Sequence, residues 1–223
     1  MEKAPPPPAQ QETKGLYRLI TRIDAVCSLI LPGESLADIG CDHGLVAKYA
    51  LDHGVKSVIA ADVSEKSLNK ARELLSGRQN VRFVVSDGFD SIDERVEQAV
   101  IAGMGGSKIV ELIDRLNYRP SLILGAQSDR RKLREYLVTH GYKITRDFCF
   151  YDRGKYYDFI RAEEGKSERY SETQLEYGAF YKQRNADLRA KAEEQKRKIL
   201  GYKLTLENEK RLEMAEEVLS WQQ

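Results

Sequence analysis

Cysteine is scarce in this chain of 223 residues, which contains only Cys27, Cys41 and Cys149. The three lie far apart, and none belongs to a C-x-x-C pair or to a C-x-x-x-H cluster. Because disulfide-rich domains and structural zinc modules depend on closely spaced cysteines, we expect no disulfide framework and no bound metal. A protein of the reducing cytoplasm fits this cysteine usage best.

Long apolar runs are also missing. The longest ones, such as residues 122–124, are far shorter than the roughly 20 residues that a helix needs to span a bilayer. The first residues, Met1–Ala4 followed by four prolines, contain no apolar core of a secretory signal. We therefore expect a protein that has no membrane partner.

An excess of one charge sign is the third absence. The 36 Lys and Arg residues nearly equal the 35 Asp and Glu residues, so the net charge is +1. Because contacts to phosphates supply much of the affinity for nucleic acids, many RNA-binding proteins are strongly basic. An RNA-binding role for this chain therefore has to rest on local patches of cations.

The order of patterns along the chain predicts three segments. Residues 1–14 are rich in Pro and Gln and predict a disordered tail. Residues 15–165 begin with a helical pattern over 16–31 and then alternate short apolar runs with helical patterns, which predicts an α/β domain with a mostly parallel sheet. The expected strands cover residues 36–39, 57–61, 81–85, 99–102 and 122–126, followed by an antiparallel edge hairpin over 142–151 and 156–162.

The third segment, residues 166–223, predicts a helical coiled-coil arm. Positions spaced alternately by four and three residues form a weak heptad seam. A second seam is out of phase with the first, and Gly201 lies between them, so a helical hairpin or a kinked coiled coil is expected. The first seam consists of Tyr181, Asn185, Leu188, Ala192, Gln195, Ile199 and Tyr202, and the second of Leu212, Ala215 and Leu219.

The loop after the first expected strand carries the clearest signature, DIGCDHG over residues 38–44. Gly40 and Gly44 are separated by three residues, so the G-x-G-x-x-G pattern of a dinucleotide-dependent dehydrogenase is absent. An acidic residue two positions before the first glycine is typical of S-adenosylmethionine enzymes. There, Asp38 would orient the loop or accept a hydrogen bond from the methionine ammonium. A pyrophosphate-binding loop has no use for the anions Asp38 and Asp42.

The ends of the next strands support the same cofactor. Asp62 can accept hydrogen bonds from both ribose hydroxyls of an adenosine, and a polar residue at 86–88 can meet the adenine amino group. Three glycines around Met104 leave room for a planar group close to a methyl donor. The candidate cofactor-binding residues are Asp38, Gly40, Cys41, Gly44, Asp62, Val63, Asp87, Gly88, Gly103, Met104 and Gly105.

A dense basic patch follows the fifth strand, where Asp129 is placed to cap the next helix. These cations either bind phosphates or form an exposed helix face, and the same two readings apply to the basic stripe on the first helix. The candidate RNA contacts are Arg18, Arg22, Arg130, Arg131, Lys132 and Arg134.

Together these features resemble the bacterial tRNA adenine-N1 methyltransferase family that modifies position 22, known as TrmK. The strings LADIGCDH at 36–43 and VIAGMGG at 100–106 carry the resemblance, with the edge hairpin and the helical tail. The chain departs from the family at 127–129, which reads Gln-Ser-Asp rather than Gln-Pro-Asn, and at 44–47. The resemblance implies a Rossmann-like class I methyltransferase domain with a helical C-terminal arm, S-adenosylmethionine as donor and tRNA as substrate. We also expect a monomer or weak homodimer.

Methyl transfer is an in-line displacement, and the N1 lone pair of adenine is already a nucleophile, so positioning should dominate the rate. We expect Asp42 to stabilise the positive charge that develops on the base, and His43 to hydrogen-bond the loop or the substrate. The Gly103 carbonyl would accept from the N6 amino group, and Gln127 and Asp129 would hold the adenine edge. The open alternatives are methylation of another RNA position, a protein or a small molecule, and a non-catalytic module that binds S-adenosylmethionine or RNA.

Overall fold

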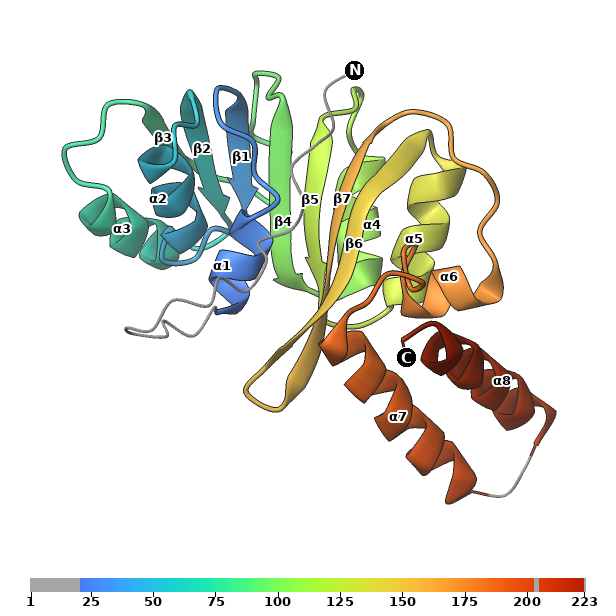
Figure 1. The fold of residues 1–223 in the computed structure, drawn as a ribbon. Coiled ribbons are helices and arrows are strands. Elements are labelled where there is room, and N and C mark those ends of the chain that lie inside the picture. Colours follow the sequence, from blue (N-terminus) through green and yellow to red (C-terminus); the bar gives the residue numbers. More distant parts are fainter. Residues whose placement is uncertain (1–20, 203–204, 223) are drawn as a thin grey trace.

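A sheet of seven strands organises the part of the chain that the computed structural model describes, residues 21–202 and 205–222 (Figure 1). The strand order is β3-β2-β1-β4-β5-β7-β6. The first five strands pair in parallel, whereas β7 is antiparallel to both β5 and β6. This confirms the predicted α/β fold with its antiparallel edge hairpin. The strands are β1 (Ser35–Ile39), β2 (Ser57–Asp62), β3 (Val81–Val85), β4 (Gln98–Met104), β5 (Ser121–Ala126), β6 (Tyr142–Asp152) and β7 (Lys155–Glu164).

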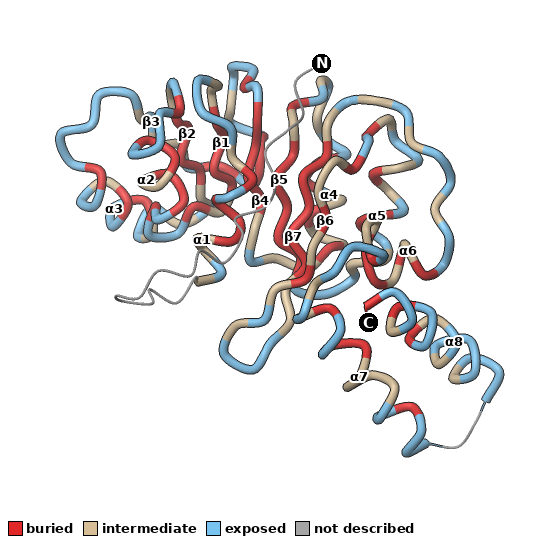
Figure 2. Tube along the Cα trace, in the orientation of Figure 1, coloured by how far each residue is buried: buried red, intermediate tan, exposed pale blue. Residues whose placement is uncertain are grey.

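Helices cover both faces of the sheet. Leu36 of β1 packs on the side of α1, α2 and α3, whereas Ala37 and Ile39 pack on the side of α4 and α5, because successive side chains of a strand point to opposite faces. Figure 2 shows the buried residues that run along the strands. The helices are α1 (Arg22–Cys27), α2 (Leu45–Asp52), α3 (Glu65–Leu74), α4 (Gly106–Asp114), α5 (Arg130–Thr139), α6 (Glu172–Tyr177), α7 (Ala186–Leu200) and α8 (Leu206–Trp221).

The last two helices form the predicted helical hairpin. α7 and α8 lie side by side and extend away from the sheet (Figure 1). Leu188 and Ala192 of α7 pack against Ala215 and Val218 of α8, and this cluster continues onto Cys149 of β6. The apolar contacts thus join the two helices to each other and to the edge of the sheet. Among the described residues, no helix has the length and apolar character needed to cross a membrane.

Two positions of the predicted seam do not lie in it. Asn185 is the N-cap of α7, where its Oδ1 accepts a hydrogen bond from the Leu188 amide at 2.9 Å and its Nδ2 donates to the Cys149 carbonyl at 2.9 Å. Tyr202 follows the end of α7 and is 66% exposed. The prediction was wrong at these positions because the spacing rule assumes one helix across them, whereas a polar cap starts α7 after Asn185.

The N-terminal predictions lie largely outside the described residues. These include the tail over 1–14, the start of the helix over 16–31 and the candidate RNA contact Arg18. Within the described part, α1 begins at Arg22 because Thr21 and Asp24 form a capping box, with reciprocal bonds from amide to side chain of 3.0 and 3.3 Å. α1 ends at Cys27, well before residue 31.

Candidate active site at the carboxyl ends of the strands

The loops that follow β1, β2, β4 and β5 meet at one end of the sheet, as parallel pairing requires. The amides of Gly40 and Cys41 both donate to the Ala61 carbonyl, at 2.8 and 3.0 Å. The Gln127 amide donates to the Met104 carbonyl at 2.9 Å. The residues predicted from separate stretches of sequence are therefore held in neighbouring, hydrogen-bonded loops.

Gly40 brings the loop after β1 directly against the loop after β4. Its φ of +72° lies in the left-handed region, and a Cβ atom there would stand 2.5 Å from Met104 Cε. A side chain at this position would therefore displace Met104, another candidate cofactor-binding residue. Gly44 plays a similar part toward α3, because its Cβ would lie 2.9 Å from Ala71 Cβ.

Asp38 anchors the first loop from inside the protein. Its side chain is 3% exposed, and its Oδ2 accepts a hydrogen bond from the Ala47 amide in the first turn of α2 at 3.1 Å. Burial raises the pKa of Asp38 from 3.8 to about 7; the bond from Ala47 opposes this rise and the nearby Asp62 carboxylate adds to it. Of the two predicted roles, the orientation of the loop is the one for which a contact is present.

A chain of polar contacts joins the loop after β1 to α3 at the surface of the site. His43 Nδ1 lies 2.7 Å from Asp42 Oδ2, and His43 Nε2 lies 2.9 Å from Lys70 Nζ. An ammonium can only donate, so Nε2 accepts and Nδ1 carries the proton that points to Asp42. Sequence reasoning missed Lys70, because nothing in the local pattern of α3 distinguishes it from the other exposed lysines.

Asp62 joins the first loop to the start of α3. Its Oδ2 accepts from the Asp42 amide at 3.0 Å, and its Oδ1 accepts from the Ser64 amide at 2.8 Å. Each carboxylate oxygen retains acceptor capacity, since an ionised carboxylate offers about four lone-pair sites. The next residue, Val63, is 67% exposed. A carboxylate next to an exposed apolar side chain suits the ribose and the base of an adenosine.

The loop after β3 is held against α4. Asp87 lies 3.4 Å from Arg115 and 3.5 Å from Lys108, two cations that sequence reasoning did not include. Gly88 packs so closely that a Cβ would stand 2.6 Å from Leu112 Cδ2. This close packing explains the glycine at position 88 without a role in binding a ligand. Asp87, in contrast, is half-exposed and lies at the surface beside its two partners.

Gly103 and Gln127 are neighbours across the β4–β5 pair. Gly103 has a φ of +84° and lies at a break in the strand register between Ala102 and Met104. A Cβ on Gly103 would meet Gln127 Nε2 at 3.9 Å and nothing closer. The backbone of Gly103 is therefore exposed beside the Gln127 amide, which suits a planar group that contacts both.

Asp129 occupies the expected N-cap position of α5, but its side chain does not cap the helix. Asp129 stands at the N-cap position, but its φ of +50° is left-handed and its side chain makes no capping hydrogen bond. A capping side chain needs an extended backbone, which this conformation does not provide. The carboxylate instead accepts from Ser128 Oγ at 3.3 Å at the surface of the site.

The prediction that Arg134 contacts RNA was wrong. Its side chain is fully buried, with Nε 2.7 Å from Asp147 Oδ2 and Nη2 2.8 Å from Asp158 Oδ2. Lys191 of α7 reaches the same Asp158 at 3.0 Å. A guanidinium enclosed by two carboxylates cannot contact a phosphate in solution. Arg134 lies on the inward face of α5, and the periodicity of a highly charged helix did not reveal that face.

The other cations of the patch are accessible. Arg131 pairs with Glu172 at 2.7 Å, and Lys132 is exposed with its Nζ 3.3 Å from Ser107 Oγ. Arg130 donates to the carbonyls of Gln127 and Tyr156, at 3.3 and 2.6 Å. The candidate RNA contacts at the start of α5 thus lie next to the candidate base-contacting residues.

Comparisons with known proteins agree with this geometry. Residues 19–160 match the family model described as a methyltransferase domain. A Mycoplasma pneumoniae protein described as a candidate tRNA methyltransferase is 32% identical over 156 residues, which cover 66% of this chain and 72% of that protein. The tRNA (adenine(22)-N(1))-methyltransferase of Bacillus subtilis is 30% identical over 157 residues, 66% of each chain.

Solved structures extend the likeness to nearly the whole chain. The structure of Mycoplasma capricolum TrmK with S-adenosyl-homocysteine has a TM-score of 0.80 at 21% identity and covers 93% of this chain and 100% of that one. Bacillus subtilis TrmK has a TM-score of 0.69 at 24% identity and covers 92% and 97%. At these identities the two structures establish the shared fold. On the sequence matches, this chain belongs to the family of methyltransferase domains, in the branch that contains the bacterial tRNA (adenine-22-N1)-methyltransferases.

Proposed function

We propose that this protein transfers the methyl group of S-adenosylmethionine to N1 of adenine 22 in the D-arm of tRNA. The observation that carries the proposal is the convergence of the DIGCDHG and AGMGG loops at the carboxyl ends of β1 and β4, next to Gln127 and the cations of α5. The family of the chain supplies the reaction class and the named substrate of its relatives.

The residues at this end of the sheet fit S-adenosylmethionine. The Gly40 and Gly103 backbones are bare, Asp62 keeps acceptor capacity beside exposed Val63, and Asp87 is accessible at the end of β3. The cofactor supplies a methyl group activated on a sulfonium. We propose that Asp38, through Ala47, holds the loop in place, while Asp62 binds the ribose hydroxyls and Val63 covers the adenine.

The acceptor base needs positioning more than activation. The adenine N1 lone pair attacks without prior loss of a proton, so no side chain has to act as a base. We propose that the Gly103 carbonyl and the Gln127 side chain hold the edge of the target adenine, with Asp129 beside them. Asp42 would stabilise the positive charge that the base acquires, and His43 holds the Asp42 carboxylate in place.

An adenine stacked in the folded D-arm has its N1 edge covered, so the target base has to turn out of the stack before it reaches Gln127. The partly buried Arg130 and the exposed Lys132 would bind the backbone nearby, and α7 and α8 would contact the tRNA body by shape and charge. A tRNA substrate and three unpaired cysteines both suit a cytoplasmic site of action.

Methyl transfer from labelled S-adenosylmethionine to two tRNA transcripts tests the proposal. One transcript carries adenine at position 22 and the other guanine. We expect label only in the adenine transcript, recovered as 1-methyladenosine after digestion. Label in both transcripts would support a tRNA methyltransferase whose target is a nucleotide other than adenine 22. Absence of label in both, with S-adenosylhomocysteine binding intact by calorimetry, would refute tRNA as the substrate.

A further inference from the structure

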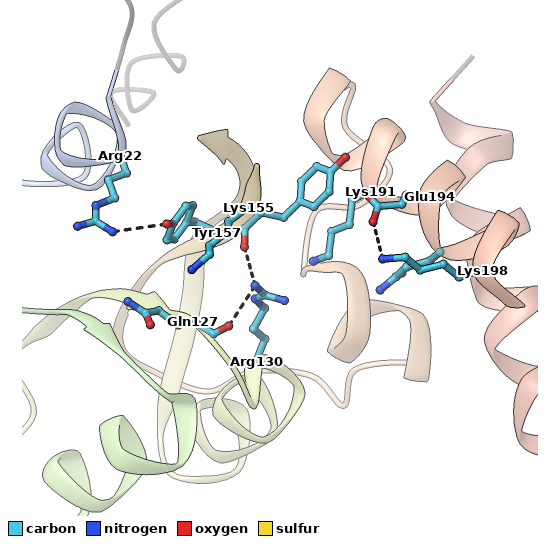
Figure 3. Close-up of a pocket in the computed structure, with 10 residues that line it drawn as sticks. Arg22, Gln127, Arg130, Lys155, Tyr157, Lys191, Glu194 and Lys198 are labelled. Atoms are coloured by element: carbon cyan, nitrogen blue, oxygen red, sulfur yellow. Dashed lines mark hydrogen bonds and ion pairs between the residues drawn. The ribbon is translucent and has the colours of Figure 1, made fainter. Parts of the chain in front are cut away.

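A cavity of about 440 Å³ opens between the β6–β7 hairpin, the start of α5 and α7 (Figure 3). Five of its ten lining side chains are cations and one is a carboxylate. Its volume lies in the range of pockets that hold a small ligand. Gln127, at the end of β5, lines this cavity and is the link to the candidate active site. None of the candidate cofactor-binding residues lines it.

The charge of the cavity is not balanced within the protein. Lys191 is paired with Asp158, and Lys198 is paired with Glu194. Lys155, in contrast, extends from the start of β7 toward the cavity and forms no ion pair within residues 21–202 and 205–222 (Figure 3). Arg130 lies 3.8 Å from Asp158, which already serves two closer cations. The surplus positive charge favours an anionic ligand.

Two buried polar atoms in the lining have no hydrogen-bond partner among the described residues. They are Arg130 Nε, a donor, and Gln195 Oε1, an acceptor. Because an unpaired buried polar group costs free energy, native proteins contain few of them. Here two such atoms of opposite kind belong to side chains that line one cavity. A ligand that accepts from Arg130 and donates to Gln195 would satisfy both.

Two aromatic side chains complete the cavity. Tyr156 and Tyr157 line it from β7, and the Arg22 guanidinium lies 5.8 Å from the centre of the Tyr157 ring and within hydrogen-bond reach of its hydroxyl (Figure 3). Single-stranded nucleic acids are commonly bound by cations that contact phosphates and by aromatic rings on which bases stack. The lining thus offers cations, rings and a hydrogen-bond acceptor together.

We propose that this cavity is a subsite for one unpaired nucleotide of the RNA substrate, adjacent in the chain to the base that is methylated. Arg130 and Lys155 bind its phosphate, Tyr156 or Tyr157 stacks on its base, and Gln195 accepts from a hydroxyl or amino group. Gln127 separates this nucleotide from the target base, so the two occupy neighbouring sites. The inference rests on the proposed function, because it assumes an RNA chain that enters the site.

The test compares the affinity of full-length variants for an unmodified tRNA transcript with adenine at position 22, as a function of salt. We expect Lys155→Ala to weaken binding about tenfold and to lower the slope of log affinity against log salt by about one, because a phosphate contact is lost. Gln195→Leu removes a neutral acceptor, so it should weaken binding about tenfold without a change of slope.

Matched controls separate the subsite from general effects on charge and folding. Arg153→Ala removes a cation from the same hairpin turn, where its side chain is 89% exposed and outside the cavity. Gln183→Leu repeats the Gln to Leu change at an exposed position outside the cavity. Both controls should bind tRNA like the unmodified protein, and all four variants should bind S-adenosylhomocysteine with unchanged affinity.

Unchanged tRNA affinity in both Lys155→Ala and Gln195→Leu would overturn the subsite and leave the proposed function standing, provided that the unmodified protein methylates tRNA. Equal losses in the test and control variants would also overturn it, since they would show a diffuse charge effect. Failure of the unmodified protein to bind or methylate tRNA would overturn the proposed function and the subsite together.

Discussion

Asp38 makes the stability of the folded protein depend on pH. Its carboxyl is buried beside Asp62, and burial raises its pKa from 3.8 to about 7. Between these two values the folded protein keeps a proton on Asp38 that the unfolded chain has released. The folded state therefore binds more protons, and the contribution of Asp38 to stability falls as the pH rises from about 4 to about 7.

We predict that Asp38→Asn removes this pH dependence, because the amide oxygen can still accept from Ala47 and the group no longer titrates. Between pH 4 and pH 7, the difference in the free energy of unfolding between the two proteins should change by a few kcal/mol. One extra bound proton corresponds to about 1.4 kcal/mol for each step of one in pH. Urea denaturation at several pH values measures the difference. Parallel curves for the two proteins across this window would show that Asp38 titrates normally.

At the scale of secondary-structure elements, the charged network under α5 fixes the position of α7. Lys191 is 5% exposed and reaches Asp158 of β7, which Arg134 of α5 also contacts. Burial alone would raise the pKa of Asp158, but the charges of Lys191, Arg134 and Arg130 hold it well below its usual range. A truncation of the C-terminal arm would also remove Lys191, a partner of Asp158, and so would disturb the sheet domain. Point variants are therefore better suited to measure how the arm is anchored.

We predict that Lys191→Met lowers the free energy of unfolding by about 2–4 kcal/mol, because it leaves a buried carboxylate with fewer counter-charges. Lys196→Met is the matched control on the same helix. Lys196 pairs with Glu216 at the surface, and such pairs contribute about 0–1 kcal/mol. Urea denaturation at pH 7 compares the two variants. Equal losses would mean that the Lys191–Asp158 pair does not anchor α7.

At the scale of the whole molecule, the distribution of charge matters more than its sum. The net charge is only +1, yet cations from α1, α5, β7 and α7 gather around one cavity near the carboxyl ends of the strands. Elements that are far apart in the sequence contribute to this cluster. The molecule can therefore attract a phosphate backbone to one face without being basic overall.

We predict that tRNA binding depends steeply on salt, although the net charge is close to zero. With about four phosphates contacted, affinity should fall on the order of a hundredfold between 50 and 200 mM salt. Binding of S-adenosylhomocysteine, measured by calorimetry in the same buffers, is the control and should change little. If the affinity for tRNA changed with salt as little as the affinity for S-adenosylhomocysteine does, the result would contradict a phosphate-binding face.

The α/β order, the edge hairpin and the glycine-bearing loops could all be predicted from the amino-acid sequence, because they depend on local periodicity and turn chemistry. Which cations of the charged stretch in α5 are enclosed and which reach a cavity depends on the packing of elements that are far apart in the sequence. Arg134 and Arg130 belong to the same charged stretch, but the first is enclosed by Asp147 and Asp158 while the second lines a cavity. Charge alone does not reveal which side of a helix faces a partner from another element. The pairing of Lys191 with Asp158 and the presence of Gln127 and Gln195 in the lining of one cavity likewise depend on how distant segments pack, which no local pattern records.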